Sequence, residues 1–403
     1  MLQRDLVIFG GGVAGLWLLD DAIRAGYSAI LIEASALGTG QTVASQGIIH
    51  GGLKYTLQGL LTGSAAAIRE MPQIWRDCLS GKRQPDLSET PVRSDSCYLW
   101  RTDSVSSRLG MIGAKFGLRV APQNLDHQDR PEALDGVPGT VARLEEQVIS
   151  PAGLIKNLAS KHQDSIIQVD ADRTEFELAR NGQVQSIRFV HPNTEETLTV
   201  APTQIIFTAG AGNATLRRQA GLNSQTMQRR PLHMVLARGP LPRLNGHCVD
   251  GAKTRVTITS DMDSENRTVW QIGGQLSETG VTQSARELIA SAQAELSVVL
   301  PKIDFSNVEW ATYRVDRAEG RTSNGGRPET YQVDETGNIL TAWPTKLVLA
   351  PQLATEILDR LQPPSGQPSE AVSDQWPRPQ VAKCPWELAT WSTLSSSSHR
   401  EAA

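Results

Sequence analysis

The sequence predicts an α/β protein whose first domain is a parallel sheet covered by helices, joined to a second domain richer in strands. Three observations support this: an apolar strand at Leu6–Phe9, a glycine run at Gly10–Gly15 directly after it, and a second apolar strand at Ala29–Ile32 that is followed by Glu33. Strand, glycine turn, helix, strand and acid in this order form the first βαβ unit of a dinucleotide-binding domain.

Each glycine of the run has a physical reason. Gly10 permits a tight turn, Gly12 lets the backbone approach a pyrophosphate, and Gly15 lets the following helix pack closely on the strand. The helix should begin at Val13, so that the N–H groups of Val13 and Ala14 and the positive end of the helix dipole face the pyrophosphate.

The helix should end near Ala25, and the next strand places Glu33 at its carboxyl end. An acid about 20 residues beyond the glycines holds a ribose hydroxyl in this kind of site. Its charge would repel a 2′-phosphate. Glu33 and Ala34 are therefore candidate cofactor-binding residues, although this unit alone does not separate a flavin from a nicotinamide dinucleotide.

The composition excludes several classes of protein. A chain of 403 residues has room for two or more domains, and a formal net charge of −4 gives no electrostatic footprint for nucleic acid. The four cysteines are far apart, with no C-x-x-C pair and no histidine cluster at metal spacing, so we expect reduced thiols in a cytoplasmic protein without a bound metal. The sequence shows no signal segment and no apolar run long enough to span a membrane. Peripheral contact with a membrane surface stays open as an alternative.

The order of the patterns predicts two domains that each draw on separate parts of the chain. We expect the dinucleotide domain to comprise residues 1–80, 145–225 and 316–361. A substrate or cap domain should comprise residues 81–144, which are mixed and polar, and residues 226–315, which have the pattern of strands around a helix.

Further segments support the dinucleotide domain. Ser150 before a proline predicts a helix start, because serine caps the helix and proline fits its first turn. Gln183–Phe189 and Glu196–Val200 alternate as the strands of a hairpin should. The apolar strand that follows ends in Ala209 and Gly210, which are small enough for backbone to lie against a ligand.

The last segment, residues 362–403, differs in composition from the rest of the chain. It is rich in proline and serine, so a disordered tail is expected. Trp376, Trp386 and Trp391 support an alternative, because disordered segments are poor in aromatic residues. A docked or partner-binding tail therefore stays open.

Three blocks resemble the family of FAD-dependent oxidoreductases that includes D-amino acid oxidase, glycine oxidase, glycerol-3-phosphate dehydrogenase and L-2-hydroxyglutarate dehydrogenase. They are Val7–Glu33, Gly40–Tyr55 and Ile205–Asn213, and the resemblance covers roughly residues 2–361. It implies FAD as cofactor. It also implies a glutathione-reductase-like (Rossmann) FAD-binding domain with a discontinuous α+β substrate domain built on a mixed or antiparallel sheet.

The middle block is the most specific. It reads GQTVASQGIIHGGLKY, similar to GTSSRSTKLIHGGLRY in glycerol-3-phosphate dehydrogenase and to NSGVIHAGIYY in L-2-hydroxyglutarate dehydrogenase. Both relatives oxidise a secondary alcohol on a small anion, so the resemblance favours CH–OH over CH–NH substrates. In the family this loop runs along the flavin, which implies cofactor contacts from Gly40, Gln41, Thr42, Ser45, Gln46, Gly47 and Ile49.

His50 has two interpretations. The resemblance implies a catalytic group that orients the flavin ring, takes the hydroxyl proton, or carries the flavin covalently as in relatives of dimethylglycine dehydrogenase. The alternative is a hydrogen-bonded histidine that only fixes the loop.

The carboxyl-terminal blocks depart from the family pattern. Arg314 matches the arginine of the family's G-L-R-P motif, which binds a substrate anion, but the glycine and proline of the motif are missing from this sequence. Arg317 is the alternative anion-binding residue. An arginine that only forms a surface ion pair is the structural alternative to both. Lys346, with Thr345 and Leu347, falls near a G-K-L-T-T motif and could stabilise negative charge on the reduced flavin. Arg173 is a further candidate cofactor-binding residue.

Together these features predict an enzyme that oxidises a small anionic 2-hydroxy acid or polyol phosphate by hydride transfer to flavin N5. Its electrons would pass to a quinone, a protein or oxygen. One alternative is an amine or amino-acid oxidase or dehydrogenase of the glycine or sarcosine type. The other is a non-catalytic flavoprotein.

Overall fold

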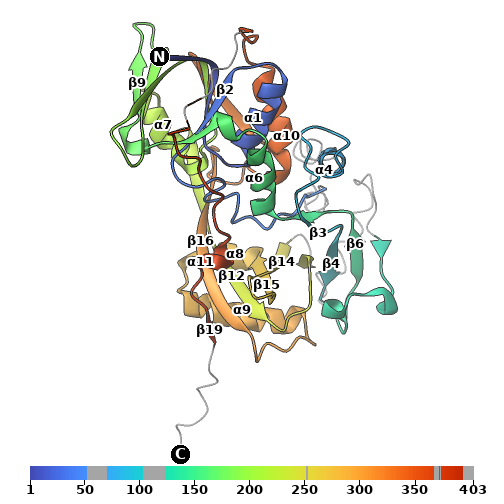
Figure 1. Cartoon of the computed structure of the whole chain (residues 1–403). Helices are drawn as coiled ribbons and strands as arrows, with labels where there is room; N and C mark the ends of the chain where they lie inside the picture. The colour runs from blue at the N-terminus through green and yellow to red at the C-terminus, as the bar shows by residue number, and fades with distance from the viewer. Residues whose placement is uncertain (52–69, 103–122, 251–252, 367–371, 373, 394–403) are drawn as a thin grey trace, which may run out of the picture.

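The computed structural model describes residues 1–51, 70–102, 123–250, 253–366, 372 and 374–393. The chain forms two lobes, each built on its own large sheet (Figure 1). Leu53, Lys54 and Tyr55, which complete the block around His50, lie outside the described residues.

The first sheet has the order β17-β18-β11-β1-β2-β8, in which β1 pairs in parallel with both β2 and β11. Gly10, at the carboxyl end of β1, therefore lies beside the ends of both neighbours, where ligands bind in open parallel sheets. Its strands are β1 (Leu2–Phe9), β2 (Ala29–Glu33), β8 (Ile166–Gln168), β9 (Glu175–Leu178), β10 (Val184–Val190), β11 (Thr197–Phe207), β17 (Gln332–Thr336) and β18 (Ile339–Trp343).

The second sheet has the order β19-β16-β12-β15-β14-β13-β4-β6-β5 and is antiparallel except where β13 pairs with β4. Its strands are β4 (Cys97–Arg101), β5 (Gln123–Asn124), β6 (Val141–Leu144), β12 (Met227–Gly239), β13 (Gly246–Asp250), β14 (Lys253–Met262), β15 (Thr268–Gly273), β16 (Glu309–Gly320) and β19 (Ser392–Thr393). A short third sheet pairs β3 (Val92–Ser94) with β7 (Val148–Ile149).

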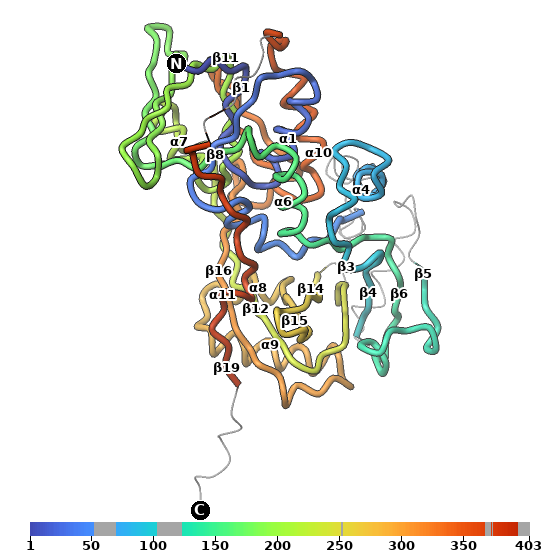
Figure 2. Tube along the Cα trace, in the orientation of Figure 1, coloured from blue at the N-terminus to red at the C-terminus, as the bar shows by residue number. Residues whose placement is uncertain are grey.

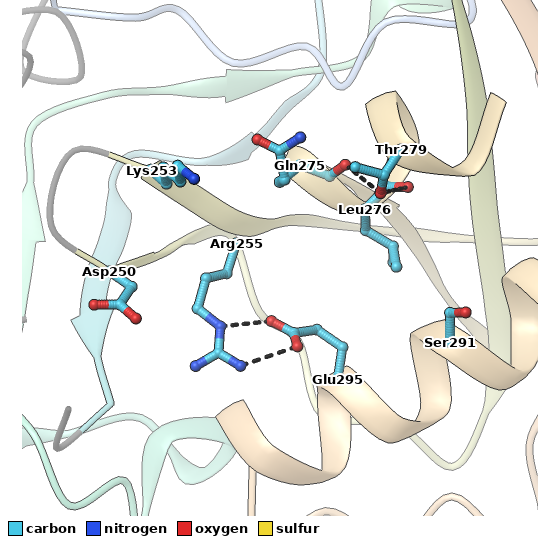
Figure 3. A pocket seen from close by; sticks show the side chains of 8 residues that line it. All are labelled: Asp250, Lys253, Arg255, Gln275, Leu276, Thr279, Ser291 and Glu295. Carbon is cyan, nitrogen blue, oxygen red and sulfur yellow. Dashed lines mark hydrogen bonds and ion pairs between the residues drawn. The ribbon is translucent and has the colours of Figure 1, made fainter. Parts of the chain in front are cut away.

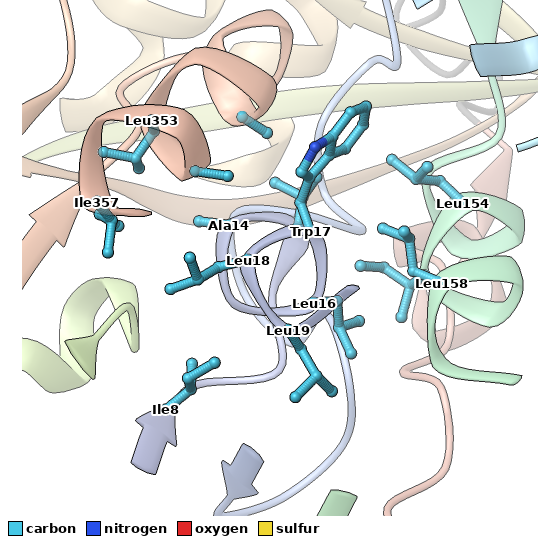
Figure 4. Close-up of a cluster of buried hydrophobic side chains, with 14 of the residues drawn as sticks. Ile8, Ala14, Leu16, Trp17, Leu18, Leu19, Leu154, Leu158, Leu353 and Ile357 are labelled. Atoms are coloured by element: carbon cyan, nitrogen blue, oxygen red, sulfur yellow. The ribbon is translucent and has the colours of Figure 1, made fainter. Parts of the chain in front are cut away.

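Helices cover one face of each large sheet. The α-helices are α1 (Val13–Arg24), α4 (Met71–Leu79), α6 (Pro151–Ser160), α7 (Asn213–Gln219), α8 (Gln275–Thr279), α9 (Ala285–Val299), α10 (Ala350–Leu358) and α11 (Pro385–Leu388). Helix α1 lies between α6 and α10, with Leu18 on the side of Ile357 and Leu16 on the side of Leu158 (Figure 4). The Trp17 ring packs on Trp75, with 4.9 Å between the ring centroids. This apolar packing fixes the start of α1, and with it the glycine turn.

The predicted fold class is confirmed, and most predicted elements are present. Ser150 caps α6 by accepting a hydrogen bond from the N–H of Gly153. One difference concerns the hairpin and the buried strand after it, which were expected as separate strands. They form one long strand, β11, whose first half pairs with β10 and whose remainder pairs with β1.

Residues 374–393 are ordered, which differs from the disorder expected of the whole tail. They run along both lobes from the first sheet to the edge of the second (Figure 2). Leu37 donates to the carbonyl of Gln380 over 2.8 Å and accepts from the N–H of Ala382 over 2.9 Å. The buried side chains of Trp376 and Trp386 each join an apolar cluster. Backbone pairing and aromatic burial thus outweigh the composition of this segment.

The described cysteines, Cys78, Cys97, Cys248 and Cys384, are all buried free thiols. Within the described ranges, no helix is both long and apolar enough to cross a membrane.

Candidate active site

The start of α1 offers an anion site. Its N-cap residue, Gly12, makes no side-chain hydrogen bond to the helix, and no acid lies in the first turn. The N–H of Val13 lies 3.4 Å from the hydroxyl oxygen of Thr42. The positive end of the dipole and its N–H groups are therefore available to a pyrophosphate.

The fingerprint glycines are required by close packing. A Cβ on Gly10 would lie 2.5 Å from the Cα of Ala209, and one on Gly15 would lie 2.0 Å from the carbonyl oxygen of Gly10. Gly10 also has a φ of +103°. Ala209, whose N–H donates to the side chain of Asn213, and Gly210 thus lie beside the glycine turn, as expected from the strand end.

Glu33 is held at the carboxyl end of β2 by backbone donors. One carboxylate oxygen accepts from the N–H of Gly11 over 2.7 Å, and the other accepts from Ala34 over 2.9 Å and from Ser35 over 3.0 Å. The carboxylate is thereby oriented at the glycine turn, which is the geometry needed to bind a ribose hydroxyl.

The loop of the middle block lies between the two lobes. Gln46 donates to the carbonyls of Thr257 and Gln271 over 3.0 and 2.8 Å, and Gln41 accepts from the N–H of Ala318 over 2.9 Å. The carbonyl of Ala44 accepts from the hydroxyl of Tyr313 over 2.9 Å and from the Gln271 amide over 3.1 Å.

Several buried polar atoms in this region could form hydrogen bonds to a cofactor or substrate. The buried Ser45 Oγ, Gln271 Oε1 and Arg317 Nε have no hydrogen-bond partner among the described residues. Buried polar atoms are almost always paired. Together with the open start of α1, these atoms fit a bound dinucleotide and its substrate.

Gly47 and Ile49 fix the path of the loop toward His50. Gly47 has a φ of +71°, and a Cβ there would lie 2.1 Å from the carbonyl oxygen of Ile149. Ile49 is buried, and its N–H donates to the carbonyl of Gln147 over 2.9 Å. His50 therefore leaves the loop in a defined direction.

His50 lies beside a carboxylate and a second histidine. Its Nδ1 is 3.5 Å from Oε2 of Glu146, and Nε2 of His247 is 3.8 Å from the same oxygen. The other oxygen of Glu146 accepts from the N–H of Gly51 over 2.6 Å. Burial alone would raise the pKa of Glu146, but hydrogen bonds and charge from the two histidines outweigh it and lower that pKa well below its usual range.

No signal in the sequence indicated Glu146 or His247, because they come from the loop after β6 and from β13, far from His50 in the chain. The ligand atoms of His50, Glu146 and His247 all lie within 4.8 Å of one another, so they could also hold a metal ion. A search for metal spacing along the chain cannot detect such a cluster.

Arg314 and Arg317 point to different partners. Arg314 is exposed and donates to the backbone carbonyls of Val281 and Gln283 over 2.7 and 2.9 Å. Arg317 is half-buried, and its NH1 donates to Glu278 over 3.1 Å. Burial and the nearby Arg230 lower the pKa of Arg317.

The alternation along β16 separates these two arginines. Because side chains alternate along a strand, Arg317 and Tyr313 lie on the same face of the sheet, the face that contacts Ala44. Arg314 lies on the opposite face, with Thr312. Across the strand, Arg230 pairs with Arg317, and its guanidinium makes hydrogen bonds of 2.6 and 2.9 Å to the fully buried Glu319.

The turn before α10 contains no glycine. Thr345 takes a φ of +59°, a conformation in which glycine is favoured, and the N–H of Lys346 donates to the carbonyl of Pro344 over 2.7 Å. The Lys346 ammonium group is 3.3 Å from the carbonyl of Glu329. Leu347 begins the short 3₁₀-helix η8 (Leu347–Leu349).

Arg173 is not brought to the glycine turn by any described contact. It is exposed at the end of the short 3₁₀-helix η5 (Ala171–Arg173), and its guanidinium binds both carboxylate oxygens of Glu195 over 3.1 and 2.5 Å. Its predicted role in cofactor binding has no support from this placement.

Two cavities adjoin the second sheet. One, of about 750 Å³, is lined by Gly40, Ala44, Tyr313 and Arg314, together with residues of the tail. The other, of about 680 Å³, lies among α8, α9 and β14, where Glu295 binds the Arg255 guanidinium through two hydrogen bonds (Figure 3). None of the described residues that line this second cavity is a predicted site residue.

Comparisons with known proteins indicate the family to which the chain belongs. The family profile described as FAD dependent oxidoreductase (DAO) matches residues 5–337. A probable FAD-dependent oxidoreductase of Pseudomonas aeruginosa is 40% identical over 394 residues, which cover 96% of this chain and 98% of that protein. The crystal structure of an FAD-dependent oxidoreductase from the same organism superposes with a TM-score of 0.80 at 37% identity, covering 96% of this chain and 98% of the other.

More distant structures share the fold. Glycine oxidase from Geobacillus kaustophilus has a TM-score of 0.66 at 15% identity, covering 95% of this chain and 100% of its own. L-α-glycerophosphate oxidase from Mycoplasma pneumoniae, solved with FAD bound, has a TM-score of 0.63 at 14% identity with the same coverage.

The chain belongs to the family of FAD-dependent oxidoreductases that includes D-amino acid oxidase. It is an FAD-dependent oxidoreductase, and the open start of α1 with the oriented Glu33 carboxylate fits that cofactor.

Proposed function

We propose that this enzyme oxidises the secondary alcohol of a small anionic substrate, either a 2-hydroxy acid or a polyol phosphate. The main support is His50, an imidazole at the contact between the two lobes with a carboxylate beside it. It lies in the block that resembles the alcohol-oxidising relatives. A neutral imidazole can take a proton near neutral pH, which an alcohol must lose when it becomes a carbonyl.

In this proposal His50 accepts the hydroxyl proton at its Nε2, because its Nδ1 faces Glu146. FAD, when bound, supplies the acceptor of the hydride and hence of both electrons. The acidic Glu146 then balances the charge of the imidazolium. The electron acceptor in the second half of the reaction would be a quinone, a protein or oxygen.

For the anionic group of the substrate we propose Arg317 in place of Arg314. Arg317 shares a sheet face with Tyr313, which contacts the middle loop, and its buried Nε has no hydrogen-bond partner among the described residues. The two terminal nitrogens of Arg314, NH1 and NH2, each already donate one hydrogen bond to a backbone carbonyl. A guanidinium with a donor to spare can bind a carboxylate or phosphate through paired hydrogen bonds.

We propose that Lys346 supports negative charge on the reduced flavin. It lies in the turn before α10, near the position of the lysine in the G-K-L-T-T motif, and it is buried with its ammonium group near a backbone carbonyl. A buried cation at this position would favour the reduced, anionic cofactor.

The test is anaerobic reduction of the purified FAD-loaded protein by single compounds. We expect L-2-hydroxyglutarate, glycerol 3-phosphate or a close analogue to bleach the flavin, and sarcosine and glycine to leave it oxidised. Bleaching by the amines alone would overturn the proposal in favour of an amine oxidase or dehydrogenase. A flavin that no compound reduces would favour a non-catalytic flavoprotein.

A further inference from the structure

The cluster of His50, Glu146 and His247 indicates a role for Glu146 in addition to the role of His50 as base. We propose that Glu146 is a positioning residue which, held between Gly51 and His247, fixes His50 in the tautomer with its proton on Nδ1. The proposal rests on the proposed function only for the role of His50 as base. The arrangement of the three side chains stands on its own.

The two oxygens of Glu146 have separate tasks. Oε1 accepts from the backbone N–H of Gly51 over 2.6 Å, which fixes the carboxylate to the residue next to His50. Oε2 faces both imidazoles, 3.5 Å from Nδ1 of His50 and 3.8 Å from Nε2 of His247. The two rings are 5.6 Å apart between centroids and tilted by 31°. Because its backbone and side-chain partners surround it, Glu146 has little freedom to turn.

His247 is anchored from its other side. Its Nδ1 lies 2.9 Å from the hydroxyl oxygen of Thr257, the residue opposite it on β14. Its side chain is 4% exposed, against 23% for that of His50. The inner histidine is therefore fixed in the sheet, while the outer one remains accessible to a substrate. Glu146 connects the two.

The chemistry follows from this orientation. With its proton on Nδ1 and directed at Glu146, His50 keeps an unprotonated Nε2 that can accept a proton. When the substrate C–H bond breaks, both of its electrons leave with the hydride to the cofactor, and the O–H proton passes to Nε2. The product is a carbonyl and an imidazolium whose positive charge lies beside the Glu146 carboxylate. A carboxylate that orients an imidazole in this way is well known to preserve the reactive tautomer.

The same three atoms could instead bind a divalent metal, since all lie within 4.8 Å of one another. The two readings predict opposite states of His50. A metal needs the lone pair of Nδ1, so the proton would move to Nε2. The positioning role needs the proton on Nδ1. We favour the latter because Nδ1 of His50 is buried and faces an ionised carboxylate.

The experiment is ¹⁵N NMR of the full FAD-loaded chain with labelled histidine, at neutral pH in EDTA and again after one equivalent of zinc chloride. The chain has seven histidines, and a His50→Gln variant assigns the signal of His50. We expect the Nδ1–H tautomer in both samples. An Nε2–H tautomer, or stoichiometric zinc that shifts the His50 and His247 signals together, would overturn the proposal.

Glu146→Gln tests the role of the carboxylate, since it keeps the shape but loses the charge. We expect a mixture of His50 tautomers and, with a substrate found by anaerobic reduction, a 10- to 100-fold slower flavin reduction with substrate Kd within about threefold. Glu146→Asp should recover part of the rate. The exposed His127 offers a control, His127→Gln, without effect. An unchanged tautomer in Glu146→Gln overturns the positioning role, whereas absence of any substrate for the wild type overturns only the proposed function.

Discussion

Individual side chains in this enzyme are held by backbone groups before they meet any ligand. Glu33 is bound by three N–H groups, and Glu146 by the N–H of Gly51. The sequence was enough to propose Glu33 and His50 as site residues, because both belong to contiguous motifs. It could not predict Glu146 or His247, since only the fold brings the loop after β6 and strand β13 to His50.

His50→Gln should lower the rate constant of flavin reduction by about 100-fold or more, because a positioned base contributes roughly 10²–10⁴. Stopped-flow absorbance of the anaerobic enzyme measures this rate. His247→Gln should cost less, since His247 reaches His50 only through Glu146. Equal losses in the two variants would argue against a base at His50.

Arg317→Gln and Arg314→Gln form a matched pair on one strand. If Arg317 binds the anion, its loss should raise the substrate Kd by about 10- to 100-fold, equivalent to roughly 1.5–3 kcal/mol for a charge-assisted hydrogen bond. Arg314→Gln should leave Kd within about threefold. Titration of flavin absorbance with a slow substrate or product analogue gives both values, and the reverse ranking would restore Arg314 to the role.

At the scale of elements, the tail connects the two lobes. Its backbone pairs with Leu37, which precedes the middle block, and β19 adds to the edge of the second sheet next to β16. The guanidinium of Arg238 lies 4.2 Å from the ring centroid of Trp391. The composition alone predicted disorder here, because the content of proline and serine is high. It holds no information on the sheet edge and the apolar surface against which the tryptophans pack.

Trp376→Ala should destabilise the protein by about 3–5 kcal/mol, the usual cost of removing a buried aromatic side chain. Leu388→Ala, in the same segment but 69% exposed, should change stability by less than about 0.5 kcal/mol. Urea unfolding of the FAD-loaded protein compares them. Two equally stable variants would show that the tail is not docked in solution.

At the scale of the whole molecule, stability should depend on the ionisation of Glu146. Its pKa is lowered in the folded protein, so its contribution is complete above its unfolded value of about 4.3 and is lost as the pH falls toward the folded value. Glu146→Gln should therefore be less stable at pH 7 but lose less stability between about pH 5 and 3. Thermal unfolding against pH measures both slopes, and parallel curves would contradict a depressed pKa.

The architecture was the most predictable part of the molecule. The order of strand, glycines, helix and acid determines the first lobe, because the steric requirements of Gly10 and Gly15 are local. The second sheet was predicted only as a class. The sequence did not show which side chains of β16 lie on the same face of this sheet. The choice between Arg314 and Arg317 therefore needed the observed strand register.

The measurement closest to the central claim uses two compounds with one carbon skeleton, L-2-hydroxyglutarate and L-glutamate, or a similar hydroxy acid and amino acid pair identified by anaerobic reduction. Each is mixed with the FAD-loaded enzyme in a single anaerobic turnover while flavin absorbance is followed. We expect the hydroxy acid to reduce the flavin in a reaction that depends on His50. Faster reduction by the amino acid, or reduction by the hydroxy acid at an unchanged rate in His50→Gln, would contradict it.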